Sequence, residues 1–114
     1  MTILIAGWLD FPPETARSMI EAADPLIRAA LDEPGCRAYS WALDPTKAGR
    51  IHVFEEWASE ADLQFHFDNA PYKQMGDHLR AGGMSDFSVK KYRSDLAEPV
   101  YDDQGVPRSD FFTA

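Results

Sequence analysis

Residues 34–75 read PGCRAYSWALDPTKAGRIHVFEEWASEADLQFHFDNAPYKQM. A Pro-Gly turn is followed by two runs rich in apolar and aromatic residues, 36–44 and 50–58, and the turn that joins them suits an antiparallel hairpin. Ser59 then offers a helix N-cap, with Asp62 at the capping-box spacing. We therefore expect a pair of strands that leads directly into a helix.

The flanking sequence extends this pattern to a β-α-β-β-α-β order. In residues 2–10 the side chains alternate in the way that predicts a first strand, and residues 84–93 are expected to form the last strand. Between the first strand and the Pro-Gly turn, apolar residues keep a helical period across Pro25, so we expect this proline to kink one long helix. Pro71 is expected to restart the second helix, which continues to the glycine pair at 82–83.

The element order predicts a ferredoxin-like α+β domain over residues 1–93, with a four-stranded antiparallel sheet and both helices on one face. Both alternating sets of hairpin side chains are apolar, whereas two helices can cover only one face. We therefore expect the second face to be buried in a homodimer. Residues 94–114 lack a clear period but end in two aromatic residues, so they are either a disordered tail or a segment that docks on the partner subunit.

Composition limits the classes of partner. The chain of 114 residues has nineteen acidic and eleven basic side chains and a formal net charge of −8, which repels nucleic acid and anionic membranes. Cys36 is the only cysteine, so no intramolecular disulfide or thiolate metal cluster can form. The apolar N-terminal run is too short for a membrane helix and lacks the features of a signal peptide. These observations predict a cytoplasmic protein.

His66 is the first candidate for chemistry. It lies between Leu63 and Phe67 on the expected buried face of a helix. Histidine exchanges protons near neutral pH, so His66 could take a proton from a phenol. The alternative is a core histidine that is hydrogen-bonded to a strand carboxylate or a backbone carbonyl.

Glu55 shares a strand face with Val53 and Trp57, so its carboxylate requires a partner inside the protein. It could orient His66, or it could form a salt bridge with a basic residue such as Arg37 or Arg50 at a dimer interface. Both interpretations remain open at this stage.

The other candidate residues are aromatic side chains and histidines. Aromatic residues at strand spacing could stack on a flat ligand, although such residues usually belong to the core. His52 and Glu55 are separated by an odd number of residues, so they face opposite sides of a strand and do not form an iron site with His66. His78 is expected to face solvent.

Three motifs, PGC, VFEEWAS and LQFHF, follow one another in a characteristic order. By this order the chain resembles the antibiotic biosynthesis monooxygenase family of dimeric α+β barrels, in particular its quinol-monooxygenase-like members, over residues 2–93. The resemblance implies a pocket between sheet and helices in each subunit. It also implies oxidation of quinols or polyketide aromatics by molecular oxygen without metal or flavin. Glu55 and Trp57 match the Glu-x-Trp strand end of the family, and His66 matches the helix histidine.

The chain departs from several subgroups of the family. A second histidine that is often found near the following proline is replaced by Tyr72. Polyketide-oxidising members have Asn and Tyr where this chain has Val53 and Leu63. Haem-degrading members need a tryptophan at the position of His66 and an axial histidine at that of Gly76, so haem degradation is not expected.

We therefore expect a cofactor-independent monooxygenase that oxidises a hydroxylated aromatic or quinol-type small molecule, with molecular oxygen as co-substrate. The alternatives are a non-catalytic dimeric protein that binds small ligands or is associated with stress, and a non-oxidative isomerase or lyase with the same histidine as base. The expected catalytic residues are His66 and Glu55, and the expected substrate-binding residues are Trp57, Tyr72, Trp41 and Phe67.

Overall fold

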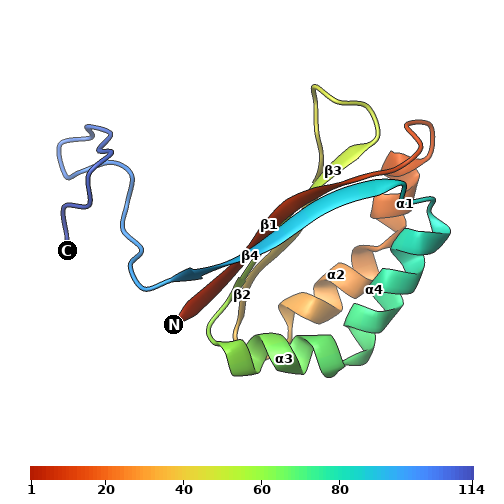
Figure 1. The fold of residues 1–114 in the computed structure, drawn as a ribbon, viewed down its shortest axis with the longest axis horizontal. Coiled ribbons are helices and arrows are strands. Elements are labelled where there is room, and N and C mark those ends of the chain that lie inside the picture. Colours follow the sequence, from red (N-terminus) through yellow and green to blue (C-terminus); the bar gives the residue numbers. More distant parts are fainter.

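The computed structural model describes residues 1–114. Its strands are β1 (Thr2–Asp10), β2 (Cys36–Leu43), β3 (Arg50–Trp57) and β4 (Asp86–Ser94), and its helices are α1 (Ala16–Ala22), α2 (Asp24–Leu31), α3 (Glu60–Asp68) and α4 (Ala70–Ala81). The strands form one antiparallel sheet in the order β2-β3-β1-β4. All helices lie on one side of this sheet (Figure 1). The expected ferredoxin-like α+β fold is confirmed.

The expectation of one long kinked helix before β2 is wrong, because Pro25 divides it. α1 ends at Ala22, and the N–H of Ala23 donates to the carbonyl of Ile20 at 3.1 Å. The carbonyl of Ala23 then accepts from the N–H groups of Leu26 and Ile27 at the start of α2. Proline lacks an N–H and its ring does not fit inside a continuous helix, but it fits the first turn of a new one. Ala23 therefore caps both helices.

Local signals set the ends of α3 and α4; the Ser59 cap and the restart at Pro71 were expected, and the Asn69 cap was not. The Ser59 hydroxyl accepts from the N–H of Asp62 at 3.1 Å, and the side chain of Asn69 accepts from the N–H at the start of α4. Pro71 occupies the first turn of α4. The chain turns away after α4 at Gly83, whose φ of 87° favours glycine. None of the helices combines the length and the apolar character needed to cross a bilayer.

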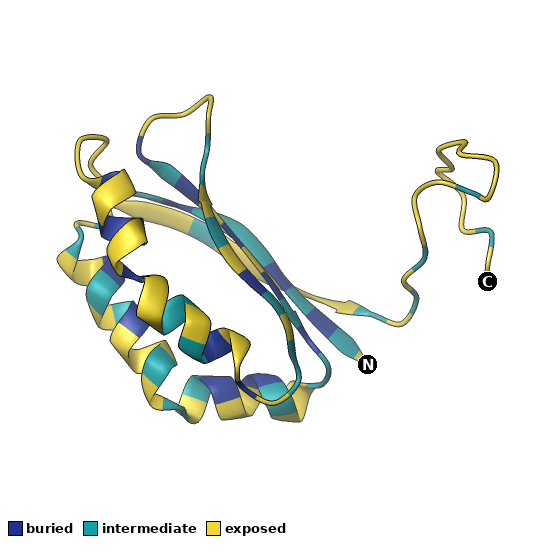
Figure 2. Ribbon diagram, turned by 180° about the vertical axis from the view of Figure 1, so that it is seen from behind, coloured by how far each residue is buried: buried dark blue, intermediate teal, exposed yellow.

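The core lies between the helices and the inner face of the sheet, and the outer helix surfaces are exposed (Figure 2). Alternate residues of β1 and β3 point inward, as a pleated sheet requires. The core side chains that the sheet supplies are Ile3, Ile5, Leu9, Tyr39, Ile51, Val53 and Trp57, and the helices add Ala16, Met19, Ile20, Ala30, Leu63, Met75 and Leu79. Burial of each large apolar side chain stabilises the fold by about 1.5–3 kcal/mol.

No helix covers the other side of the sheet (Figure 1). The register pairs Ala6 of β1 with Phe54 of β3, and Leu4 of β1 with Tyr92 of β4. Phe54 is 42 % exposed and Tyr92 is 51 % exposed. We call the surface formed by Leu4, Ala6, Trp8, Phe54 and Tyr92 the open sheet face.

Residues 95–114 extend away from the sheet and helices as a tail (Figure 1). The tail closes on itself through a bridge between Tyr101 and Pro107, and the Glu98 carboxylate accepts from the N–H of Phe112 at 2.9 Å. Its surface is largely exposed (Figure 2). Four of its apolar side chains, Val100, Tyr101, Val106 and Phe111, are exposed.

Candidate active site

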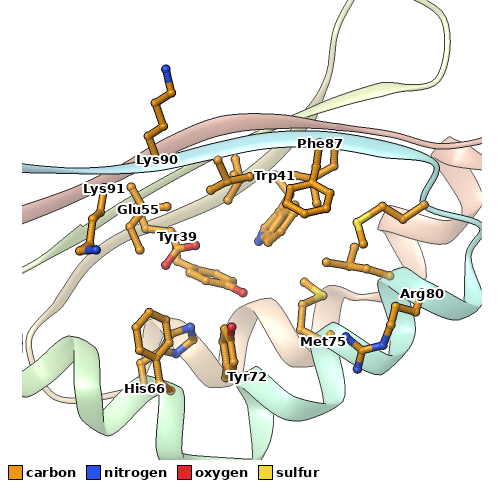
Figure 3. A pocket seen from close by; sticks show the side chains of 18 residues that line it. Tyr39, Trp41, Glu55, His66, Tyr72, Met75, Arg80, Phe87, Lys90 and Lys91 are labelled. Carbon is orange, nitrogen blue, oxygen red and sulfur yellow. The ribbon is translucent and has the colours of Figure 1, made fainter.

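A cavity of about 390 Å³ lies between the inner face of the sheet and the helices (Figure 3). Its wall is formed by 18 residues, 12 of them hydrophobic. Phe87 and Val89 of β4 lie on one side, and Tyr72 and Leu79 of α4 lie on the other. A cavity of this size and character accommodates a small aromatic molecule.

His66 of α3 faces this cavity and is held by a buried carboxylate. His66 is 1 % exposed, and its Nδ1 lies 2.6 Å from Oε1 of Glu33. The other oxygen of Glu33 accepts from the side-chain amide of Asn69 at 2.6 Å. An ionised carboxylate only accepts hydrogen bonds, so the Nδ1 of His66 carries a proton. The Nε2 is then the ring nitrogen that this pair leaves free.

Glu33 was not among the residues expected from the sequence. It lies between α2 and the Pro34-Gly35 turn, where no period predicts which way a side chain points. Its backbone is fixed on both sides, because its N–H donates to Ala30 and its carbonyl accepts from Cys36. The one sequence signal was an acidic residue directly before a tight turn.

Glu55 does not bond to His66, in contrast to one of the two expectations. Its Oε1 accepts from the indole N–H of Trp57 at 3.0 Å. Burial raises the pKa of the Glu55 carboxyl above its usual value, and the hydrogen bond from Trp57 and the proximity of His66 offset this effect in part. Glu55 therefore lines the cavity as a carboxyl group that is held by a tryptophan.

The second expectation for Glu55, a salt bridge with Arg37 or Arg50, is not observed within the chain. The guanidinium of Arg37 lies 3.7 Å from Glu56, and that of Arg50 lies 2.8 Å from Asp10. Both cations thus have other partners.

Trp57 stands behind the cavity wall rather than in it. Its side chain is fully buried, and its ring centroid lies 4.5 Å from that of His66 with 32° between the ring planes. Tyr72 and Tyr39 meet the same imidazole edge-on, at 5.3 Å and 5.5 Å. Trp57 therefore fixes the imidazole and Glu55, and it has no surface left to contact a ligand.

Trp41, Phe67 and Tyr72 all line the cavity, where the sequence placed substrate-binding residues. The indole N–H of Trp41 is buried and makes no hydrogen bond of normal length, although it lies close enough to the Tyr39 hydroxyl to lower the pKa of that phenol in part. Burial, and next the nearby Glu55 carboxylate, raise the pKa of the Tyr39 phenol, so its hydroxyl stays protonated and can donate. The sheet side of the cavity thus offers donors to a ligand oxygen.

The remaining candidate residues lie outside the site. His52 is on the opposite side of the sheet, where it bonds to Asp44 at 2.7 Å. His78 does not face solvent as expected: it is half-buried, and its Nε2 donates to the carbonyl of Met19 at 2.7 Å. Burial raises the pKa of the Cys36 thiol to about 11, which disfavours the reactive thiolate. No three acidic, histidine or cysteine side chains gather in a way that could hold a metal ion.

Comparison with known proteins gives a family match. The family model described as antibiotic biosynthesis monooxygenase matches residues 2–77. An uncharacterized protein of Synechocystis is 33 % identical over 70 residues, which are 61 % of this chain and 47 % of that protein. The match thus spans about half the length of this relative.

Solved structures share the fold. A protein of Deinococcus radiodurans, described provisionally as an antibiotic biosynthesis monooxygenase, has a TM-score of 0.78 at 20 % identity, and the match covers 88 % of this chain and 99 % of that one. A conserved protein of Methanosarcina mazei has a TM-score of 0.74 at 21 % identity, with coverage of 83 % and 94 %. At these identities the similarity establishes the fold alone.

Proposed function

This chain belongs to the antibiotic biosynthesis monooxygenase family, and from that premise we propose that it is a cofactor-independent monooxygenase. Its substrate would be a hydroxylated aromatic or quinol-type small molecule. The observation that carries the proposal is the Glu33–His66 pair, in which His66 lines a largely apolar cavity and Glu33 holds its imidazole from behind.

In the proposed reaction His66 acts as the general base. Its Nε2 takes the proton of the substrate hydroxyl, while Glu33 holds the Nδ1 proton and stabilises the imidazolium that forms. Asn69 keeps the Glu33 carboxylate in place. His66 is thus the catalytic residue, and Glu33 is a positioning residue.

Glu55, which the sequence placed in the catalytic pair, takes a different role in this proposal. Its bond to Trp57 fixes the indole that packs against His66, and so keeps the imidazole aimed at the cavity. Trp41, Phe67 and Tyr72 would contact the substrate ring.

The deprotonated substrate then reacts with dioxygen directly. It passes one electron to dioxygen, the resulting radical and superoxide join at a ring carbon, and the hydroperoxide loses water to give a quinone. The net reaction converts a phenol and one dioxygen molecule into a quinone and one water molecule. The protein supplies the base, the orientation and an apolar cavity, and the redox chemistry is that of the substrate.

The indole N–H of Trp41 supports a ligand that carries oxygen. A buried donor without an acceptor is unfavourable, and such groups are rare in folded proteins. A phenol or quinone oxygen in the cavity would accept this hydrogen bond. The donor therefore favours hydroxylated aromatics over plain hydrocarbons.

We also propose that the chain forms a homodimer through the open sheet face, and that the tail docks on the partner subunit. The open sheet face presents apolar side chains that no helix covers, and the tail presents four more. Contiguous exposed apolar surface of this kind usually marks an interface.

The test of the function is oxygen uptake by chelator-treated protein with a panel of quinols and polycyclic phenols. We expect uptake by the unmodified chain and a loss of uptake in His66→Gln. Glu33→Gln should also lower uptake, and Glu60→Gln is its matched control, because Glu60 is an exposed carboxylate in the first turn of α3. Binding without uptake would instead indicate a ligand-binding protein, and product without uptake would indicate an isomerase or lyase.

A further inference from the structure

The inner face of the sheet is left uncovered along β4, and we propose that the tail of the partner subunit docks there and completes the mouth of the cavity. This inference rests on the dimer and the tail docking proposed above. It adds the surface that the tail binds, and it makes each site a product of both subunits.

β4 lies at the edge of the sheet and continues the face that carries the core. The register places Phe87, Val89, Lys91 and Arg93 of β4 opposite Leu9, Gly7, Ile5 and Ile3 of β1. Residues directly opposite each other share a face. The isoleucine and leucine side chains of β1 are at most 7 % exposed, whereas Phe87 is 60 % exposed and Val89 is 39 % exposed. The helices therefore cover this face at β1 but not at β4.

We call Phe87, Val89, Lys91 and Arg93 the β4 rim. The first three of these residues line the cavity, and Figure 3 shows Phe87 and Lys91 on its sheet side. All four are exposed, and neither cation forms an ion pair within the chain. The β4 rim thus presents apolar surface and free positive charge side by side.

The tail has a fixed shape and apolar side chains to bury. The N–H of Arg108 donates to the carbonyl of Val100 at 2.8 Å, and the Asp102 carboxylate accepts from the N–H of Val106 at 3.0 Å. Val100, Tyr101 and Val106 are nevertheless exposed. A segment that is already folded loses little conformational entropy when it binds. The tail is therefore a preformed docking element.

The charges of the two surfaces are complementary. Residues 95–114 carry five acidic side chains and one basic side chain, Arg108. Arg108 is paired with Asp102 and Asp110 inside the tail, whereas the exposed carboxylates of Asp95 and Asp103 have no cationic partner. Opposite charges steer association and fix orientation, so the acidic tail fits the basic β4 rim.

A second copy of β4 fits this edge less well than the tail does. β4 pairs only with β1, so one row of its backbone N–H and C=O groups has no partner strand. Pairing of two such edges would bring together Lys90, Lys91 and Arg93 of both copies. Like charges on paired strands are destabilising. The tail brings acidic side chains to the same edge instead.

β4 also joins the β4 rim to the open sheet face. Its side chains alternate between the two surfaces, so Tyr92 belongs to the open sheet face and Lys91 to the rim. A tail that leaves a dimer interface on the open sheet face has only this strand to pass before it reaches the cavity. The tail of the same subunit is not placed to do so, because it extends away from the cavity at the end of β4 (Figure 1).

The inference is tested by cross-linking two single-cysteine copies with a short bismaleimide. One copy carries Val89→Cys on the β4 rim, and the other carries Gln104→Cys in the tail. Both carry Cys36→Ala, and they are coexpressed with tags of different mass. We expect a cross-linked heterodimer, because docking raises the effective concentration of the two thiols to the millimolar range.

Gln64→Cys replaces Val89→Cys in the matched control, because Gln64 is exposed on α3, away from β4. We expect its yield of heterodimer to be at least about tenfold lower, since no docking brings these thiols together. Equal yields from the two positions, or no cross-link at Val89→Cys, would overturn the inference.

A charge reversal in the tail tests the complementarity. Asp103→Lys in the copy that carries Gln104→Cys should lower the yield about three- to fivefold, the range expected for exposed charges. Glu14→Lys in the same copy is the control, because Glu14 is exposed before α1 and the charge change is the same. An equal effect of the two reversals would remove the role of charge on which the choice of the β4 rim rests.

The proposals fail separately. A dimeric mass in light scattering without the cross-link at Val89→Cys overturns the docking on the β4 rim alone. A monomeric mass overturns the dimer as well. The oxygen-uptake panel decides the proposed function independently of both.

Discussion

Glu33 and His66 are 33 residues apart in the sequence, yet Oε1 of Glu33 lies 2.6 Å from Nδ1 of His66 inside the protein. The pair joins the turn after α2 to the buried face of α3. It leaves one imidazole nitrogen for the cavity, so it links the packing of two helices to the proposed chemistry.

Glu33→Gln keeps the shape of the side chain but removes its charge. We expect kcat to fall about 100-fold with little change in KM, because the substrate still fits while the imidazolium loses its compensating charge. Steady-state oxygen uptake measures both constants. An unchanged kcat would mean that Glu33 has only a structural role.

His66→Ala removes one member of a buried pair. The carboxylate of Glu33 then keeps only Asn69 as a partner, and a cavity forms beside Trp57. We expect the free energy of unfolding to fall by about 3–5 kcal/mol, as measured by urea denaturation. A loss below about 1 kcal/mol would show that the pair contributes little to stability.

Glu55→Gln tests the buried carboxyl group through the pH dependence of stability. Because the pKa of Glu55 is raised in the folded chain, the native state binds more protons than the unfolded state above the usual pKa of 4.5. This group therefore makes the native chain less stable as the pH rises from 4.5 toward the raised pKa. We expect Glu55→Gln to gain stability relative to the unmodified chain over that interval in urea denaturation at several pH values. A constant difference between the two proteins would contradict the assignment.

Trp41→Phe removes the unpartnered indole N–H while it keeps an aromatic ring. We expect the free energy of unfolding to change by less than about 1 kcal/mol, because no hydrogen bond of normal length is lost. Binding of 1-naphthol should weaken about three- to tenfold, since the ligand oxygen loses a donor. Calorimetric titration measures the affinity of both proteins for 1-naphthol. Equal affinities would show that Trp41 does not donate a hydrogen bond to the ligand.

Phe54→Asp places a charge in the centre of the open sheet face. If this face forms the dimer interface, the dissociation constant should rise at least about tenfold, because a buried unpaired charge is costly. Light scattering over a dilution series measures the mass. Phe65→Asp is the control: Phe65 is 47 % exposed, but it belongs to α3, away from this face. A monomeric mass for the unmodified chain would contradict the proposed dimer.

Local sequence was sufficient for most of the fold. The caps at Ser59 and Asn69 involve only neighbouring residues. The alternation of side chains along a strand divides them between the two faces of the sheet and does not depend on the rest of the chain. The family resemblance implied the pocket, and together with the positions of His66, Trp41 and Tyr72 on predicted elements it placed these residues there. The sequence pattern around Pro25 did not distinguish one kinked helix from two separate helices, because both arrangements place the same apolar residues on the same side.

The sequence by itself thus determined the order of the elements and the face on which each candidate residue lies, because both depend on short-range period and capping. The tertiary structure decided the partners. Only the packing of the α2–β2 turn against α3 brings Glu33 to His66. Glu55 instead accepts a hydrogen bond from Trp57. Packing also ties His78 to Met19 instead of solvent. A hydrogen bond between distant segments depends on distances of a few tenths of an ångström, and no periodicity in the chain encodes them.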